Sequence, residues 1–156
     1  MLNPFRRTTL SARQERAVQR TLQQLRQQRR QRFRILACID GSEESFITVR
    51  FAARRGAQIV FHPHYHWADE HSYRPTSFAD PKNSFHEKAL LCRAAENTVW
   101  IASANFASEG SPTTSAIVRP DGTLLAYQPY GKAGLLVADL ELSEATGLLA
   151  SRLRPS

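Results

Sequence analysis

A strand–helix–strand pattern constrains the fold of this chain more than any other feature. Residues 33–40 (FRILACID) form a short apolar run that Gly41 ends, and residues 57–63 (AQIVFHP) form a second one that stops at its proline. Between them, residues 43–55 carry apolar side chains at a helical period, and Gly56 follows where a helix favours a glycine cap. A strand, a helix and a strand in this order join parallel, neighbouring strands. The sequence therefore predicts an α/β domain.

The rest of the chain predicts further strands, which are partly antiparallel. The expected elements are a helix over 83–97 capped by Asn83 or Ser84, a strand over 99–105, a hairpin over 113–129 that turns at Pro120-Asp121-Gly122, a strand over 134–142, and a helix from the cap Ser143 to Arg152. Cys92 falls on the predicted inner face of the first of these helices and is expected to lie in the core.

The beginning of the chain differs in composition from the rest. The net charge of the whole chain is +7, and residues 1–37 hold ten arginines with Glu15 as their single acidic residue. Residues 10–33 contain no Gly or Pro, and Val18, Leu22 and Leu25 make a narrow apolar stripe at helical spacing. We therefore expect two parts: a helical Arg/Gln-rich segment over 1–33 and a folded domain over 34–156.

The cysteine count and the hydropathy pattern bear on the compartment. Two cysteines are too few for a disulfide framework, so a reduced, cytoplasmic setting is expected. No apolar run approaches the ~18–20 residues of a membrane span, and the start of the chain lacks the apolar stretch of a secretory signal. The sequence accordingly predicts no membrane partner.

Four stretches, taken in order, resemble the nitrilase, or carbon–nitrogen hydrolase, superfamily. They are Leu36-Ala37-Cys38-Ile39-Asp40; the segment RFAARRGAQIVFHP over 50–63; Arg93-Ala94 with Glu96-Asn97, followed by a strand that ends at Asn105; and SAIVRPDG over 115–122, followed by a strand that ends at Asp139-Leu140. Each is weak alone, but their order and spacing are specific. The resemblance implies the C-terminal half of a four-layer αββα sandwich, with a mixed sheet and helices on one face.

The same resemblance implies a set of catalytic positions. Cys38 stands at the place of the family's nucleophile, and the backbone N–H of Ile39 would stabilise the oxyanion. A fifth, less obvious match over residues 5–15 places Glu15 at the family's second glutamate. That match puts Arg7 where the family has its lysine, and a planar guanidinium does not occupy the same point as an ammonium.

The reaction that the family implies is hydrolysis of a non-peptide C–N bond in an amide, nitrile or carbamoyl group, through a cysteine thioester and without a cofactor. Only MLNPFR precedes Arg7 in this sequence, so the family's general-base glutamate is expected to be missing. Losing a general base costs about 10²–10⁴ in rate. Whether the chain is an active enzyme therefore stays open, and we expect weak turnover or none.

The histidine-rich loop after residue 63 allows more than one interpretation. The resemblance places His64, Tyr65 and Trp67 at the mouth of a substrate pocket. His64, His66 and Glu70 also imitate a metal-binding pattern, but the histidine needed farther along the chain is absent after His86, so no metal is predicted. An exposed polar loop remains the third interpretation.

Two kinds of partner other than a small amide or nitrile substrate follow from the sequence. Half a sandwich exposes an apolar sheet face, so a homo-oligomer is expected. The arginine-rich segment raises an alternative, non-catalytic function in nucleic-acid binding. That segment has few aromatic residues and no groove-reading motif, so we regard nucleic acid as the weaker hypothesis.

Overall fold

The computed structural model describes residues 35–37, 43–67, 69 and 71–152. Its elements, in chain order, are β1 (Ile35–Ala37), α2 (Glu43–Arg54), β2 (Ile59–His64), α3 (His86–Asn97), β3 (Trp100–Asn105), β4 (Ala116–Val118), β5 (Leu124–Tyr127), the 3₁₀-helix η1 (Leu142–Glu144) and α4 (Leu148–Arg152). The helix predicted over 10–33 and the predicted boundary at residue 34 lie outside the described residues.

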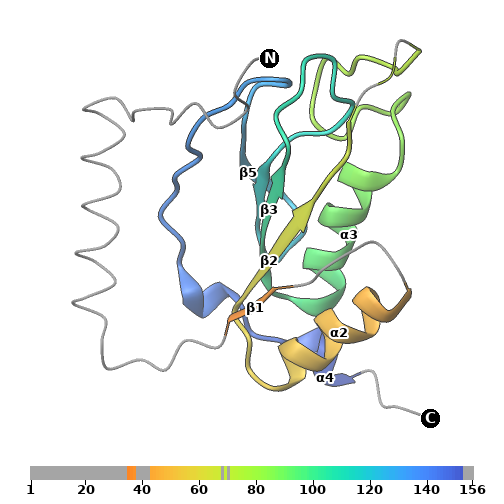
Figure 1. Cartoon of the computed structure of the whole chain (residues 1–156). Helices are drawn as coiled ribbons and strands as arrows, with labels where there is room; N and C mark the ends of the chain where they lie inside the picture. The colour runs from red at the N-terminus through yellow and green to blue at the C-terminus, as the bar shows by residue number, and fades with distance from the viewer. Residues whose placement is uncertain (1–34, 38–42, 68, 70, 153–156) are drawn as a thin grey trace. The chain divides into compact units, whose positions relative to one another are not determined.

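The strands form one mixed sheet in the order β1-β2-β3-β4-β5 (Figure 1). β1, β2 and β3 are parallel, and the strand–helix–strand unit predicted from residues 33–63 is confirmed. β4 and β5 are antiparallel and form the predicted hairpin. Its turn is closed by Gly122, whose N–H donates to the Arg119 carbonyl at 2.9 Å, and Gly122 has a φ of +84°.

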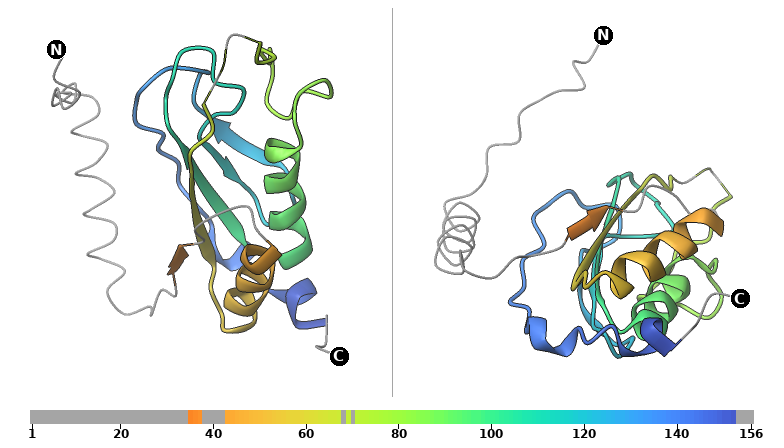
Figure 2. Two further views of the ribbon diagram at one scale, coloured as in Figure 1. Left: turned by 45° about the vertical axis from the view of Figure 1, so that its right-hand side comes forward. Right: turned by 90° about the horizontal axis from the view of Figure 1, so that it is seen from below.

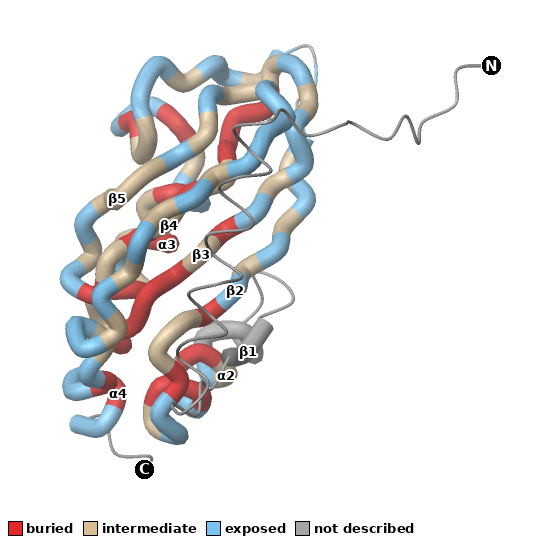
Figure 3. Tube along the Cα trace, turned by 90° about the vertical axis from the view of Figure 1, so that its left-hand side faces the viewer, coloured by how far each residue is buried: buried red, intermediate tan, exposed pale blue. Residues whose placement is uncertain are grey.

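Helices α2, α3 and α4 pack against one another and lie on the same side of the sheet, as both views of Figure 2 show. The core lies between them and the sheet, and its buried residues are among the red stretches of the tube in Figure 3. Its buried members are Val49, Ala53, Val60, Leu90, Ala94, Val99, Ile101, Val118 and Ala150. The predicted α/β class, with a mixed sheet and helices on one face, is confirmed.

The segment predicted as a strand over 134–142 is not a strand, and this prediction was wrong. The segment runs along the sheet face opposite the helices (Figure 2). It is tied to the sheet by side chains rather than by a ladder: the indole N–H of Trp100 donates to the Glu141 carbonyl at 3.1 Å, and the Gln58 amide donates to the Leu142 carbonyl at 2.9 Å. Leu136, Leu140 and Leu142 are half-buried, whereas Leu135 and Val137 are exposed, so the apolar pattern of the segment reflects partial burial on one side without strand pairing.

Several predicted element ends were also wrong. The last helix is split, because Gly147 adopts a φ of +62° between η1 and α4, and Glu141 rather than Ser143 caps η1. α3 begins after Phe85, which provides no side-chain cap. β2 continues through Pro63 to His64, where Pro63 pairs with Ala104.

The inner face of α3 was predicted only in part. Glu87, Leu90, Ala94 and Asn97 are buried at helical spacing, whereas Cys92 is exposed. The prediction that Cys92 lies in the core was therefore wrong. The inner face instead contains two polar residues beside Leu90 and Ala94, and one of the two is a buried carboxylate.

Candidate functional site

The carboxyl ends of the three parallel strands meet at one edge of the sheet, where α/β proteins commonly bind ligands. Ala37, the last residue of β1, pairs with Phe61 of β2, which pairs in turn with Ala102 of β3. Cys38 follows Ala37 directly in the sequence. The described part of β1 therefore ends at this edge with Ala37, and Cys38 itself lies outside the described residues.

The predicted catalytic residues themselves lie outside the described residues. These are Cys38, Ile39, Glu15 and Arg7. Their roles stay predictions. The described part of the site consists of the ends of β2 and β3 and of the loops that follow them.

Four imidazoles gather at the end of β2. The rings of His62 and His64 stack with centroids 5.2 Å apart, and those of His66 and His86 lie 4.3 Å apart. Burial, followed by the nearby His62, lowers the pKa of His64 from 6.5 to about 4. Burial also lowers the pKa values of His66 and His86. These shifts favour the neutral form of His64, His66 and His86 near pH 7, and neutral imidazoles can accept protons or bind metal ions.

The arrangement of the cluster does not make a metal centre. Among the described residues, no group of three or more His, Cys, Asp or Glu side chains is placed to hold a metal ion. Instead, His64 Nδ1 is hydrogen-bonded to the Ser103 hydroxyl at 3.1 Å.

Asn105, the last residue of β3, holds the loops around this edge. Its side-chain oxygen accepts the His66 N–H at 2.8 Å, and its amide N–H donates to the His66 carbonyl at 3.0 Å. The amide also contacts Ser111 and Thr113 on the loop after β3, at 3.1 and 2.9 Å. One amide thus fixes the loop after β2 to the loop after β3.

The three residues predicted to shape a substrate pocket have different environments. His64 is half-buried, whereas Tyr65 and Trp67 are exposed, and Tyr65 packs against Phe106 with ring centroids 5.3 Å apart. A cavity of about 400 Å³ lies among the neighbouring loops, and none of the three residues lines it.

The sequence interpretation missed Glu87, whose side chain is buried and contacts three loops. Its carboxylate accepts the Ala79 N–H at 2.8 Å, the Thr114 N–H at 3.1 Å and the Tyr130 hydroxyl at 2.9 Å. Burial raises the pKa of Glu87 above its usual value, and these three donors oppose the shift. The spacing in the sequence could have indicated this burial, because Glu87 lies three residues before Leu90 and seven before Ala94 on the inner face of α3.

The chain is similar to solved structures of the nitrilase superfamily. One is an amidase of that superfamily from Nesterenkonia, solved as a cysteine-to-alanine mutant, with 30% identity, a TM-score of 0.50, and coverage of 76% of this chain and 41% of the amidase. Another is the NitN amidase of Nesterenkonia, with 29% identity, a TM-score of 0.52, and coverage of 76% and 42%. A carbon–nitrogen hydrolase from Helicobacter pylori shares the fold at 19% identity, with a TM-score of 0.50 and coverage of 70% and 41%.

No family model and no curated protein sequence matches the chain. The chain spans about two fifths of the length of the solved structures that it matches. None of the helices in the described ranges has the length and apolarity that a membrane crossing requires. The resemblance predicted from the sequence is confirmed, and the chain corresponds to part of a nitrilase-superfamily protein.

Proposed function

We propose that this chain carries the nucleophile of a carbon–nitrogen hydrolase and that Cys38 attacks small amides. The observation that carries the proposal is the position of β1 in a sheet that matches nitrilase-superfamily amidases. Ala37 ends that strand at the edge where the parallel strands end, and Cys38 is the next residue in the sequence. The cysteine-to-alanine change in the solved Nesterenkonia amidase supports the importance of a cysteine in that relative.

The proposed reaction has two halves. The thiolate of Cys38 adds to the amide carbon, and the Ile39 N–H stabilises the oxyanion. The C–N bond then breaks, and the nitrogen takes up the proton that the Cys38 thiol released and leaves as ammonia. The product of this half is a thioester on the sulfur. Water then adds to the thioester, and the C–S bond breaks to release the acid and restore the thiol. No cofactor takes part in either half.

We further propose that the 156-residue chain turns over slowly when it acts alone. The 156 residues match about two fifths of the amidase length, so the groups that the other three fifths contribute in an amidase lie outside this match. Arg7 in place of a lysine adds to the deficit, because losing one oxyanion donor costs about 10²–10³ in rate.

The test is ammonia release from acetamide and propionamide by the purified chain, compared with Cys38→Ser and with Cys92→Ser as the matched control. We expect slow release that Cys38→Ser abolishes and Cys92→Ser leaves unchanged, because Cys92 lies on the exposed face of α3. Release that persists in Cys38→Ser would contradict the assignment of the nucleophile. Rates typical of an efficient enzyme, with kcat/KM above about 10⁴ M⁻¹s⁻¹, would contradict the proposed impairment.

We propose a second copy of this chain as the partner for the exposed aromatic side chains of β2 and of the loops after β2 and β3, which the segment over 134–142 leaves uncovered. Phe61 in β2 is exposed at 42%, and Tyr65 and Phe106, which pack against each other after the ends of β2 and β3, are exposed at 66% and 54%. Contiguous exposed apolar side chains favour association. Light scattering should give a dimer mass that Phe61→Lys reduces to a monomer mass, whereas a monomer at all concentrations would contradict this.

If Cys38 proves inert, salt-dependent binding of labelled duplex DNA tests the alternative function of the arginine-rich segment.

A further inference from the structure

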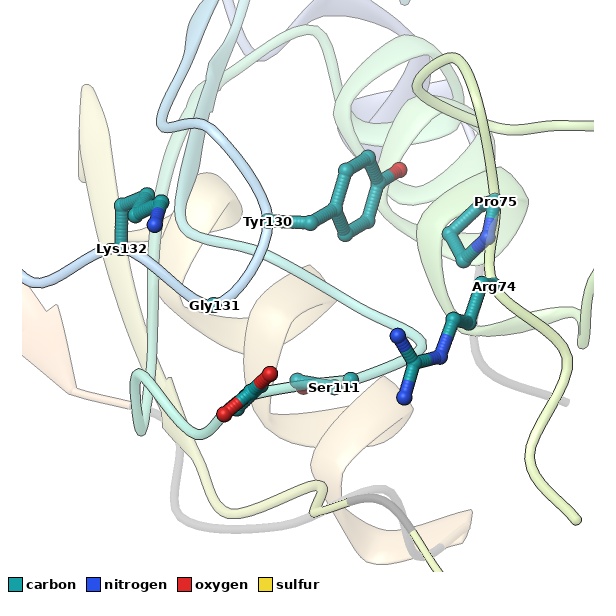
Figure 4. Close-up of a pocket in the computed structure, with 8 residues that line it drawn as sticks. Arg74, Pro75, Ser111, Tyr130, Gly131 and Lys132 are labelled. Atoms are coloured by element: carbon teal, nitrogen blue, oxygen red, sulfur yellow. The ribbon is translucent and has the colours of Figure 1, made fainter. Parts of the chain in front are cut away.

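A polar cavity lies between three loops at the same end of the domain as the strand ends of β2 and β3. Its volume is about 400 Å³, which is within the usual range for small-molecule sites. The first loop follows β2, the second follows β3 and the third follows β5. The lining residues are Arg74, Pro75, Glu109, Gly110, Ser111, Tyr130, Gly131 and Lys132 (Figure 4).

The walls of this cavity are held in place by buried hydrogen bonds. Glu87 joins the three loops through Ala79, Thr114 and Tyr130. Ser111 is buried, and its hydroxyl donates to the His66 carbonyl at 2.8 Å, which ties the second loop to the first. A cavity with fixed walls loses little conformational entropy when a ligand binds.

The charged groups around the cavity form no ion pair within the described part of the chain. Ion pairs among the described residues join Arg93 with Glu96 and Arg119 with Glu144. Arg74, Lys132 and Glu109 are exposed, and no hydrogen bond or ion pair joins their side chains to another described residue. Arg74 and Lys132 lie on opposite sides of the cavity, with Tyr130 between them (Figure 4).

We propose that this cavity binds a small amino dicarboxylate, such as an acidic α-amino acid. Two cations on opposite sides match two carboxylates, because guanidinium and ammonium groups form short charge-assisted hydrogen bonds with them. The single carboxylate of Glu109 matches the ammonium of the ligand. The Tyr130 hydroxyl is already bonded to Glu87, so the ring offers an apolar wall for the methylene groups.

This site does not depend on Cys38 and is proposed as a binding site in its own right. The ligand of this site need not be hydrolysed. Binding should therefore be the same in Cys38→Ser as in the parent chain. A failure of the Cys38 proposal can therefore be distinguished from a failure of the proposed ligand site.

The experiment is calorimetric titration of the full chain, at low ionic strength, with L-glutamate, glutarate, L-glutamine and inorganic phosphate. We expect saturable binding of L-glutamate, with the affinities for L-glutamine and phosphate at least about tenfold lower, because a charged hydrogen bond contributes roughly a factor of ten or more. Arg74→Ala and Lys132→Ala should each weaken L-glutamate binding about tenfold. Arg152→Ala, at an exposed site on α4, is the matched control and should change nothing.

Glu109→Gln separates a site for amino dicarboxylates from a general anion site. The substitution should weaken L-glutamate binding but not glutarate binding, since glutarate has no amine. The proposal is overturned if no saturable binding of L-glutamate occurs, if Arg74→Ala and Lys132→Ala leave it unchanged, or if phosphate binds as tightly.

Discussion

The hydroxyl of Tyr130 lies 2.9 Å from both carboxylate oxygens of Glu87, and this pair connects the loop after β5 to the inner face of α3. Burial raises the pKa of Glu87, and burial together with Glu87 raises the pKa of Tyr130. Because the same carboxylate also accepts two backbone N–H groups from other loops, the ends of three loops depend on one side chain.

Removing the hydroxyl of this pair should destabilise the domain. Tyr130→Phe leaves a buried carboxylate with one donor fewer, and we expect the free energy of unfolding to fall by about 1–3 kcal/mol. The measurement is urea denaturation followed by fluorescence. Tyr65→Phe is the matched control, because Tyr65 is exposed and should change stability little. Equal effects of the two substitutions would contradict the role of the pair.

Glu87 should also give the stability a defined pH dependence. Its folded pKa is raised above the ordinary value of 4.5, so the folded chain keeps a proton that the unfolded chain has lost. The stability of the parent relative to Glu87→Gln should therefore be greatest below pH 4.5 and should fall as pH rises through the folded pKa. Other titrating groups are common to both proteins. A difference that grows with pH over this window would contradict the account.

The histidine cluster should give the stability a pH dependence opposite to that of Glu87. The pKa of His64 is lowered from 6.5 to about 4, so its contribution to stability is present above pH 6.5 and is lost as pH falls toward 4. His62, His66, His86 and the Ser103 hydroxyl surround it, and their partial exposure limits the loss to about 1–2 kcal/mol. His64→Asn should flatten this acid-side loss in thermal melts. His71→Asn, at an exposed position, should not.

Gly122 should tolerate no side chain. It has a φ of +84°, and an added Cβ would lie 2.9 Å from the Cβ of Ala95 and 3.0 Å from the Leu91 carbonyl oxygen. We expect Gly122→Ala to lower the free energy of unfolding by about 1–3 kcal/mol. At Gly134 an added Cβ meets only the flexible Gln128 side chain, so Gly134→Ala should cost less. The reverse order in denaturation would contradict the packing of the hairpin turn on α3.

The sequence predicted the sheet where local pattern and connection rules agree. The parallel unit of β1, α2 and β2 and the hairpin of β4 and β5 were both predicted, since each combines apolar runs with glycine-bearing stops. The segment over 134–142 was mistaken for a strand because its alternate side chains are half-buried although its backbone pairs with no strand. An apolar pattern indicates burial but does not identify the hydrogen-bond partner.

The described part of the site was less predictable. Cys92 is exposed although it was predicted to lie in the core, and Glu87 is buried although an isolated acidic residue on a helix is normally solvated. The cavity between Arg74 and Lys132 joins residues that are far apart in the sequence and share no motif. Such a site depends on how three loops pack, and no local pattern encodes that packing.

The most direct test of the central claim is alkylation of Cys38. Because Cys92 is exposed and would react as well, the protein to use is Cys92→Ser. It is treated with iodoacetamide at neutral pH and its intact mass is recorded over time, with Cys38→Ser/Cys92→Ser as the control. We predict one adduct, formed in the folded state faster than on free cysteine and protected by excess acetamide. A thiol that reacts only after denaturant is added would contradict the assignment of Cys38 as the nucleophile.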